Sequence, residues 1–139
     1  MKKIIVTGGA GFIGSALIKH LMELKKYNIL NIDKLTYAAN LNSLESISKE
    51  QNYTFSNIDI CNRESLEAEV ELFKPDAIMH LAAESHVDRS IDDPTPFISS
   101  NIIGTFNLLE SSRLYWNKLD SNGKKSFRFH HISTDEVYG

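Results

Sequence analysis

Short apolar runs alternate along the chain with longer stretches in which apolar residues recur at helical spacing. The first run, residues 3–7 (KIIVT), is β-branched and followed by glycines, which is typical of a buried parallel strand. Strands are expected at 3–7, 29–33, 53–57, 77–81 and 127–133. Helices are expected at 12–24, at 41–48, between Asn62 and Pro75 and at 94–116, with a turn at 121–125.

Strands and helices alternate throughout, and no repeat or low-complexity segment interrupts them. This order predicts an α/β fold of the Rossmann type, a doubly wound parallel sheet with helices on both faces. The 139 residues suffice for one domain with its own core, so we expect residues 1–139 to belong to a single domain. Ligands of such sheets bind outside the carboxyl ends of the strands, where the polar motifs of this chain also fall.

The stretch TGGAGFIGS follows the first expected strand and has a GxxGxxG spacing. Gly8, Gly11 and Gly14 would allow a tight turn and the close approach of a pyrophosphate to the amides of a helix N-terminus. Asp33 closes the second strand 19 residues beyond Gly14, where an acidic residue binds an adenosine ribose and disfavours a 2′-phosphate. The pattern predicts binding of NAD rather than NADP. The alternatives are a plain tight turn and a solvated Asp33.

The composition is that of an ordinary globular protein, with 42% hydrophobic and 24% charged residues. A net charge of −3 gives no reason to expect nucleic acid or an anionic membrane as a partner. No apolar run approaches the ~18 residues of a membrane-spanning helix. The five histidines lack metal-ligand spacing, so no metal is expected. The one cysteine, Cys61, excludes an internal disulfide, is expected to be a small apolar side chain, and fits a cytoplasmic protein.

Four stretches of the sequence resemble a known family. They are TGGAGFIG (7–14), NIDKLTYAANL (31–41), MHLAAESHVDRSI (79–91) and FRFHHISTDEVYG (127–139). The first is similar to the extended short-chain dehydrogenase/reductases, and the other three resemble the dTDP-glucose 4,6-dehydratases of that superfamily over the whole chain. The resemblance implies a lyase that uses NAD to convert dTDP-glucose, a nucleotide sugar, to dTDP-4-keto-6-deoxyglucose in the rhamnose pathway.

The same resemblance implies a cofactor site made from three groups of residues. The phosphate loop would contribute Gly8, Gly11, Phe12, Ile13 and Gly14. The adenosine would contact Asp33, Lys34, Leu35, Thr36, Asp59 and Ile60. The nicotinamide ribose and its surroundings would contact Leu81, Ala82, Ala83, Glu84 and Ser100. Ala39 stands where the family often has glycine, which could tighten the loop beside the adenosine.

The C-terminal stretch STDEVYG would act on the sugar. The family reaction oxidises the sugar at C4, eliminates water across C5 and C6, and returns the hydride to C6. Elimination needs an acid for the leaving hydroxyl and a base for the C5 proton. By resemblance these are Asp135 and Glu136, with Ser85 and Thr134 touching the sugar. The alternative is that both acids are solvated residues at a frayed terminus.

Some residues of the third stretch and of the helix after it have two interpretations. His86, Asp88 and Arg89 either lie near the sugar or its diphosphate, or belong to a loop fixed by an Asp–Arg contact. Asn101 resembles the family's structural asparagine, and a buried helix asparagine bonded to the backbone is an equal alternative.

The family's oxidation base, a tyrosine with a lysine four residues on, is absent: no such lysine follows Tyr27, Tyr37, Tyr53, Tyr115 or Tyr138. We therefore expect an incomplete NAD-binding domain, the N-terminal part of a longer enzyme and inactive by itself. Its last strand would be an open edge, so we expect the chain by itself either to self-associate or to be marginally stable. A homo-oligomer is also expected. The alternatives are a free-standing NAD-binding module, or another nucleotide-sugar dehydratase or epimerase, although an epimerase needs no elimination pair.

Overall fold

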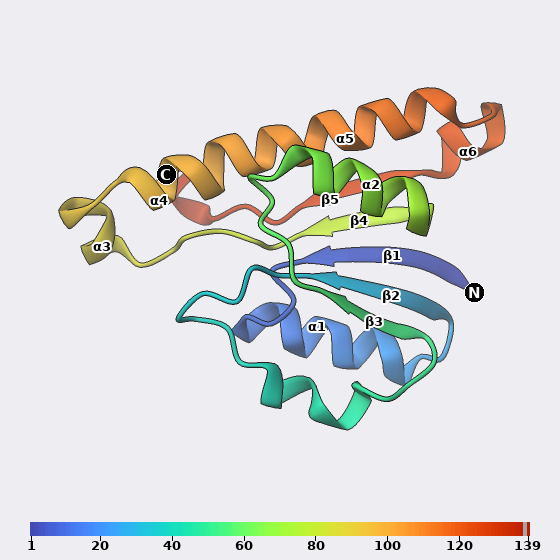
Figure 1. The fold of residues 1–139 in the computed structure, drawn as a ribbon, viewed down its shortest axis with the longest axis horizontal. Helices are drawn as coiled ribbons and strands as arrows, with labels where there is room; N and C mark the ends of the chain where they lie inside the picture. The colour runs from blue at the N-terminus through green and yellow to red at the C-terminus, as the bar shows by residue number, and fades with distance from the viewer. Residues whose placement is uncertain (138) are drawn as a thin grey trace.

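The computed structural model describes residues 1–137 and 139, apart from the side chains of Val87 and Glu136. This part of the chain forms a five-stranded parallel sheet in the order β3-β2-β1-β4-β5. Its strands are β1 (Lys2–Thr7), β2 (Tyr27–Ile32), β3 (Tyr53–Ser56), β4 (Ala77–His80) and β5 (Arg128–His131). The chain winds outward from β1 to one edge and then to the other, which confirms the predicted doubly wound fold (Figure 1).

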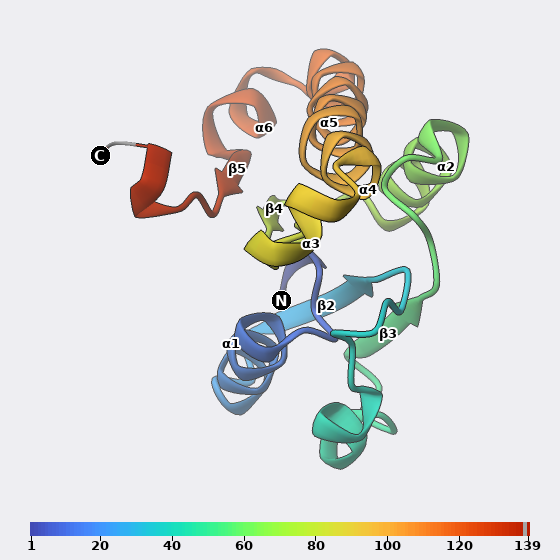
Figure 2. The same cartoon turned by 90° about the vertical axis from the view of Figure 1, so that its left-hand side faces the viewer.

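Helices cover both faces of the sheet (Figure 2). One face carries α1 (Phe12–Glu23) and the 3₁₀ segment η1 (Leu41–Ile47), and the other carries α2 (Arg63–Phe73) and α5 (Thr105–Lys118). Alternate residues of β1 fill the two cores, with Ile4 and Val6 on the α1 side and Ile5 on the α2 and α5 side. The apolar run of β1 is therefore explained by burial on both faces.

The helix expected at 94–116 is present but is not uniformly α-helical. It consists of α4 (Thr95–Phe97), a π-helical segment η2 (Ile98–Gly104) and α5, which follow one another without a break. A Cβ on Gly104 would lie 2.5 Å from Ile60 Cδ1. The missing side chain at Gly104 therefore lets the helix approach the loop after β3, an effect that periodicity does not reveal.

Other sequence predictions of secondary structure need correction. The segment at 41–48 is the 3₁₀ segment η1 rather than an α-helix. The expected turn at 121–125 is a short helix, α6 (Ser121–Ser126), in which the Asp120 side chain accepts a hydrogen bond from Gly123 N at 2.7 Å. The strand expected at 127–133 is shorter, and the loop after β4 contains an unexpected helix, α3 (Val87–Asp92). A 3₁₀ turn, η3 (Asp135–Val137), follows β5.

Candidate cofactor site

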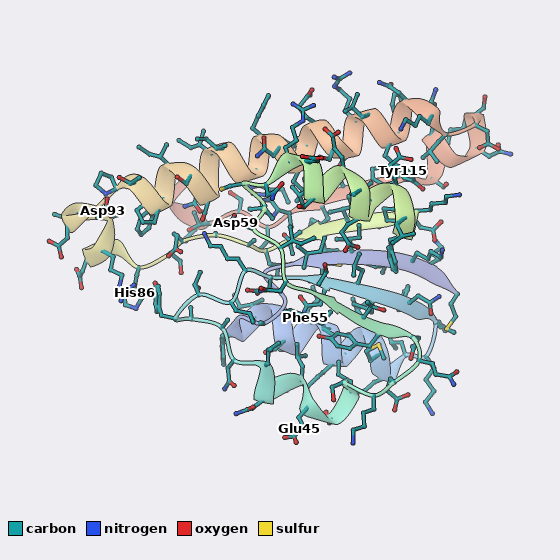
Figure 3. All side chains as sticks on the ribbon, in the orientation of Figure 1. Glu45, Phe55, Asp59, His86, Asp93 and Tyr115 are labelled. Carbon is teal, nitrogen blue, oxygen red and sulfur yellow. The ribbon has the colours of Figure 1, made fainter. Side chains whose placement is uncertain are left out.

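A cavity of about 420 Å³ lies at the carboxyl ends of β1, β2 and β4. Three segments form most of its lining: the glycine loop after β1, the loop that follows Ile32, and residues 81–85 after β4. Figure 3 shows His86 and Asp93 well beyond this end of the sheet and Asp59 closer to the strand ends. The position agrees with the rule that ligands of wound parallel sheets bind where the winding reverses.

The cavity brings together most of the residues predicted from the sequence. The residues expected to hold the cofactor all line the cavity, except Leu35 and Asp59. Ser85, which was expected to contact the sugar, also lines the cavity. Ala39 is also part of the lining. The sequence patterns did not single out Ile32, Ala38, Ile58 and Ile132, which line the cavity as well. The only sequence feature that could have indicated these four residues is their position, because each lies close in sequence to a predicted site residue or strand end.

The glycines of the loop after β1 are required for different structural reasons. Gly8 has a φ of +73°, and a Cβ there would lie 2.6 Å from Ala82 N. A Cβ on Gly14 would lie 2.2 Å from the carbonyl oxygen of Gly8. At Gly11 a Cβ would meet Gly8 O at 3.3 Å, a tight contact but a milder one than at Gly8 or Gly14. Helix α1 starts directly after Gly11, with no acidic residue in its first turn.

The Asp33 carboxylate is held in place by the backbone. Its Oδ2 accepts a hydrogen bond from Ala10 N at 2.9 Å, and its Oδ1 accepts one from Leu35 N at 2.8 Å. Leu35 has a φ of +58°, so the chain turns sharply here and directs the Leu35 amide back to Asp33. Each carboxylate oxygen keeps a further lone pair for a ligand hydroxyl.

Lys34 is occupied by neighbouring side chains. Its Nζ donates a hydrogen bond to Ser100 Oγ at 2.9 Å and lies 3.7 Å from Asp59 Oδ2. The predicted cofactor residues Lys34, Asp59 and Ser100 thus form one polar cluster between β2, the loop after β3 and η2. Asp59 contributes to the site through this cluster instead of lining the cavity.

The loop after β4 is tied to the π-helical segment and to β1. Asn101 Oδ1 accepts from Glu84 N at 2.8 Å, and Asn101 Nδ2 donates to Glu84 O at 2.9 Å. The Asn101 amide is exposed, so the interpretation of a backbone-bonded asparagine holds, but not that of a buried one. Thr7 Oγ1 accepts from Ala82 N at 3.4 Å, which joins the loop to the end of β1.

His80 forms a buried link beneath this loop. Its Nδ1 is hydrogen-bonded to Thr7 Oγ1 at 2.7 Å and its Nε2 to Thr105 Oγ1 at 2.9 Å. Burial, together with the nearby His131, lowers the pKa of His80 from 6.5 to about 4. A neutral imidazole therefore connects β1, β4 and α5 below the cavity.

The predicted catalytic residues lie on the segment after β5. Ile132 lines the cavity, while Thr134 and Asp135 do not, and Thr134 Oγ1 donates to Asp135 Oδ1 at 3.2 Å. Asp135 is exposed at the start of η3. The Glu136 side chain, predicted as the base, lies outside the described residues.

Other kinds of site find little support in the part of the chain that the structure describes. Cys61 is half-buried, its Sγ donates to Ser99 O at 3.1 Å, and burial raises its pKa, which opposes a nucleophilic role. No group of His, Cys, Asp or Glu among the described residues could hold a metal ion. Nor is any described helix long and apolar enough to cross a membrane.

A family model described as GDP-mannose 4,6 dehydratase matches residues 5–139. The chain belongs to this family. The dTDP-glucose 4,6-dehydratase of Neisseria meningitidis is 55% identical over 139 residues, which are 100% of this chain and 39% of that protein. The resemblance predicted from the sequence is thereby confirmed. The chain spans about two-fifths of the length of the curated family members that it matches.

Solved structures of the family share the fold. The dTDP-glucose 4,6-dehydratase from Bacillus anthracis in complex with NAD matches with a TM-score of 0.82 and 38% identity, covering 100% of this chain and 39% of that chain. The enzyme from Streptomyces venezuelae with NAD and TYD bound has a TM-score of 0.84 and 37% identity, covering 99% and 41% of the two chains. These matches confirm the Rossmann-type architecture.

Proposed function

We propose that the chain is the NAD-binding part of a nucleotide-sugar 4,6-dehydratase whose substrate is dTDP-glucose. The observation that carries the proposal is the cavity, in which a glycine loop faces the fixed carboxylate of Asp33. Relatives named as dTDP-glucose 4,6-dehydratases, and solved family members with NAD bound, support it. Residues 1–139 would form part of one domain of a cytoplasmic enzyme.

The residues around the cavity fit NAD. Gly8 and Gly14 allow the loop to pack tightly, and the absence of a side chain at Gly11, the N-cap of α1, would allow a diphosphate to approach the amides at the start of that helix. The two oxygens of Asp33 are positioned to accept hydrogen bonds from the adenosine ribose hydroxyls. The carboxylate would repel the 2′-phosphate of NADP, and Lys34 is engaged by Ser100 and Asp59.

The chemistry that NAD supplies when bound is hydride acceptance and hydride return. The chain's own residues would position the reactants around it. Ser85, which lines the cavity, would hold the sugar. Asn101 would keep the backbone of Glu84 in place through its two hydrogen bonds and so fix the loop that borders the nicotinamide ribose.

For the elimination step we propose Asp135 as the acid and Glu136 as the base. Asp135 would give its proton to the leaving C6 hydroxyl, which departs as water, and Glu136 would take the C5 proton. The Thr134 hydroxyl, bonded to Asp135 Oδ1, stands beside the acid and would contact the sugar. The role of Glu136 rests on the sequence alone.

The 139 residues contain no Tyr-x-x-x-Lys pair to begin the oxidation at C4. We therefore propose that this chain binds NAD without turning over the sugar by itself.

Calorimetric titration of the chain with NAD and with NADP tests the proposal. We expect saturable NAD binding and NADP affinity lower by roughly a hundredfold, because a carboxylate faces the extra phosphate. Asp33→Asn removes the charge and one acceptor, so NAD affinity should fall by about tenfold to a hundredfold. The variant's unfolding midpoint is the control for folding. Equal affinity for NAD and NADP, or none for either, would contradict the proposal.

A further inference from the structure

Two loops from opposite sides of the cavity meet at the side chain of Tyr37, and the guanidinium of Arg89 lies over its ring. Tyr37 lies on the loop after β2, and Arg89 lies on α3 in the loop after β4 (Figure 1). The guanidinium carbon of Arg89 is 3.8 Å from the centroid of the Tyr37 ring, which is a close cation–π contact. We propose that this pair is a gate, which must open whenever a dinucleotide enters or leaves the cavity. The inference rests on the proposed function.

The Tyr37–Arg89 pair lies outside the wall of the cavity. Thr36 and Ala38, on either side of Tyr37 in sequence, line the cavity, while Tyr37 itself is 51% exposed. Glu84 and Ser85, which precede α3, line the opposite wall, and Arg89 is exposed. The contact therefore connects the outer sides of the two loops that form the walls.

The first loop is anchored on both sides of the contact, and the second is anchored on the side that leads from β4. The first is held by Asp33, through Leu35 N and Ala10 N, and at its far end by the bond from Asn40 N to Ala10 O at 2.8 Å. The second is held at Glu84 by the paired hydrogen bonds of Asn101. With these ends fixed, separation of the walls requires breaking the Tyr37–Arg89 contact.

Other groups around the tyrosine strengthen the same connection. Tyr37 OH donates to Glu84 Oε2 at 3.5 Å, so the ring touches the second loop at two points. The centroid of the His86 ring is 6.0 Å from the centroid of the Tyr37 ring. Figure 3 shows His86 beside the loop after β2. A long hydrogen bond of this kind contributes less than the stacked guanidinium, so Arg89 is the residue on which the gate depends most.

A gate that closes over the free and the occupied cavity alike has a distinct kinetic signature. A contact present in both the free and the bound states slows entry and exit equally and leaves the equilibrium affinity unchanged. A side chain that touches the bound dinucleotide would instead change the dissociation rate and the affinity together.

Stopped-flow binding of NADH to the whole chain, followed by NADH fluorescence and by displacement with NAD, separates these cases. Arg89→Gln and Tyr37→Leu should each raise the association and dissociation rates by roughly two- to fivefold with Kd unchanged. Arg89→Lys keeps the cation and Tyr37→Phe keeps the ring, so both should lie near wild type. The double variant Arg89→Gln/Tyr37→Leu should be no faster than either single one.

The chain offers a matched control for these variants. Lys124 Nζ lies 5.2 Å from the centroid of Trp116, a cation–π pair at the far end of α5. Lys124→Gln should leave both rates unchanged, and unfolding midpoints should show that all variants fold. Rates unchanged in Arg89→Gln and Tyr37→Leu would overturn the gate, as would faster dissociation with a weaker Kd and unchanged association. Failure of the wild-type chain to bind NADH and NAD would instead overturn the proposed function, and the gate with it.

Discussion

At the scale of single residues, glycines of one loop serve different purposes, and substitution separates them. In Gly14→Ala the new Cβ meets backbone at 2.2 Å, so the free energy of unfolding should fall by about 2 kcal/mol or more. In Gly11→Ala the Cβ would meet one backbone atom, Gly8 O, at 3.3 Å, so the free energy of unfolding should fall less than in Gly14→Ala. The added methyl group stands where the diphosphate would approach, so NAD affinity should fall at least about tenfold.

Thermal unfolding and NAD titration of the two variants check this division. A Gly14→Ala variant as stable as wild type would refute the structural role of Gly14. Full NAD affinity in Gly11→Ala would show that the phosphates do not lie on this side of the loop.

The sequence predicted which residues line the cavity better than it predicted their contacts. Asp33 was found from its spacing to the glycine loop, because that spacing follows from one strand-helix-strand unit. The pairing of Lys34 with Ser100 could not be found in this way, since it joins segments that only the tertiary fold brings together. Arg89 shows the same limit: the sequence suggested a contact with an aspartate or a ligand, and the structure places it on the Tyr37 ring.

At the scale of elements, the helix formed by α4, η2 and α5 carries an exposed apolar stripe. Ile98, Ile102, Phe106 and Leu109 follow one another at helical spacing and are 46% to 63% exposed. We infer that a second copy of the chain covers this stripe, in line with the expected homo-oligomer. Ile102→Ser/Phe106→Ser should weaken self-association by on the order of tenfold or more.

Sedimentation over a range of concentrations measures this effect. Leu72→Ser on α2 is the matched control, because Leu72 is an 80% exposed apolar side chain outside the stripe, and it should leave association unchanged. A wild-type chain that is monomeric at every concentration would contradict the inference.

Helices and strands were predicted correctly where burial in the core determines the pattern of apolar residues in the sequence. Strands β1 and β2 are buried on both faces along most of their length, so their apolar runs were visible in the sequence. Helix α6 was missed because its sequence, SNGKKS, has no apolar face, and its Asp120 cap is a short-range signal easily taken for a turn. The close approach of the η2 segment to the loop after β3 depends on the fit of Gly104 against Ile60, which no local pattern encodes.

At the scale of the whole molecule, His80 links the sheet to α5 and makes stability depend on pH. Its pKa is lowered from 6.5 to about 4, so between these values the unfolded chain binds a proton that the folded chain excludes. Stability is therefore complete above about pH 6.5 and falls with pH down to about 4, by about 3 kcal/mol from this group.

Urea unfolding between pH 7 and pH 4 tests this dependence. His80→Gln removes the titrating group and should flatten the slope between about pH 6.5 and 4.5, whatever its effect on stability at neutral pH. An unchanged slope in His80→Gln would show that other groups control the acid sensitivity.

The central claim is that the cavity at the carboxyl ends of β1, β2 and β4 is a dinucleotide site, and a crystal structure of the chain with NAD tests it most directly. The account predicts the adenosine ribose hydroxyls within about 3 Å of the Asp33 carboxylate, and the diphosphate on the amides between Gly8 and Ile13. NAD bound elsewhere, or bound in the cavity with its ribose away from Asp33, would contradict the account.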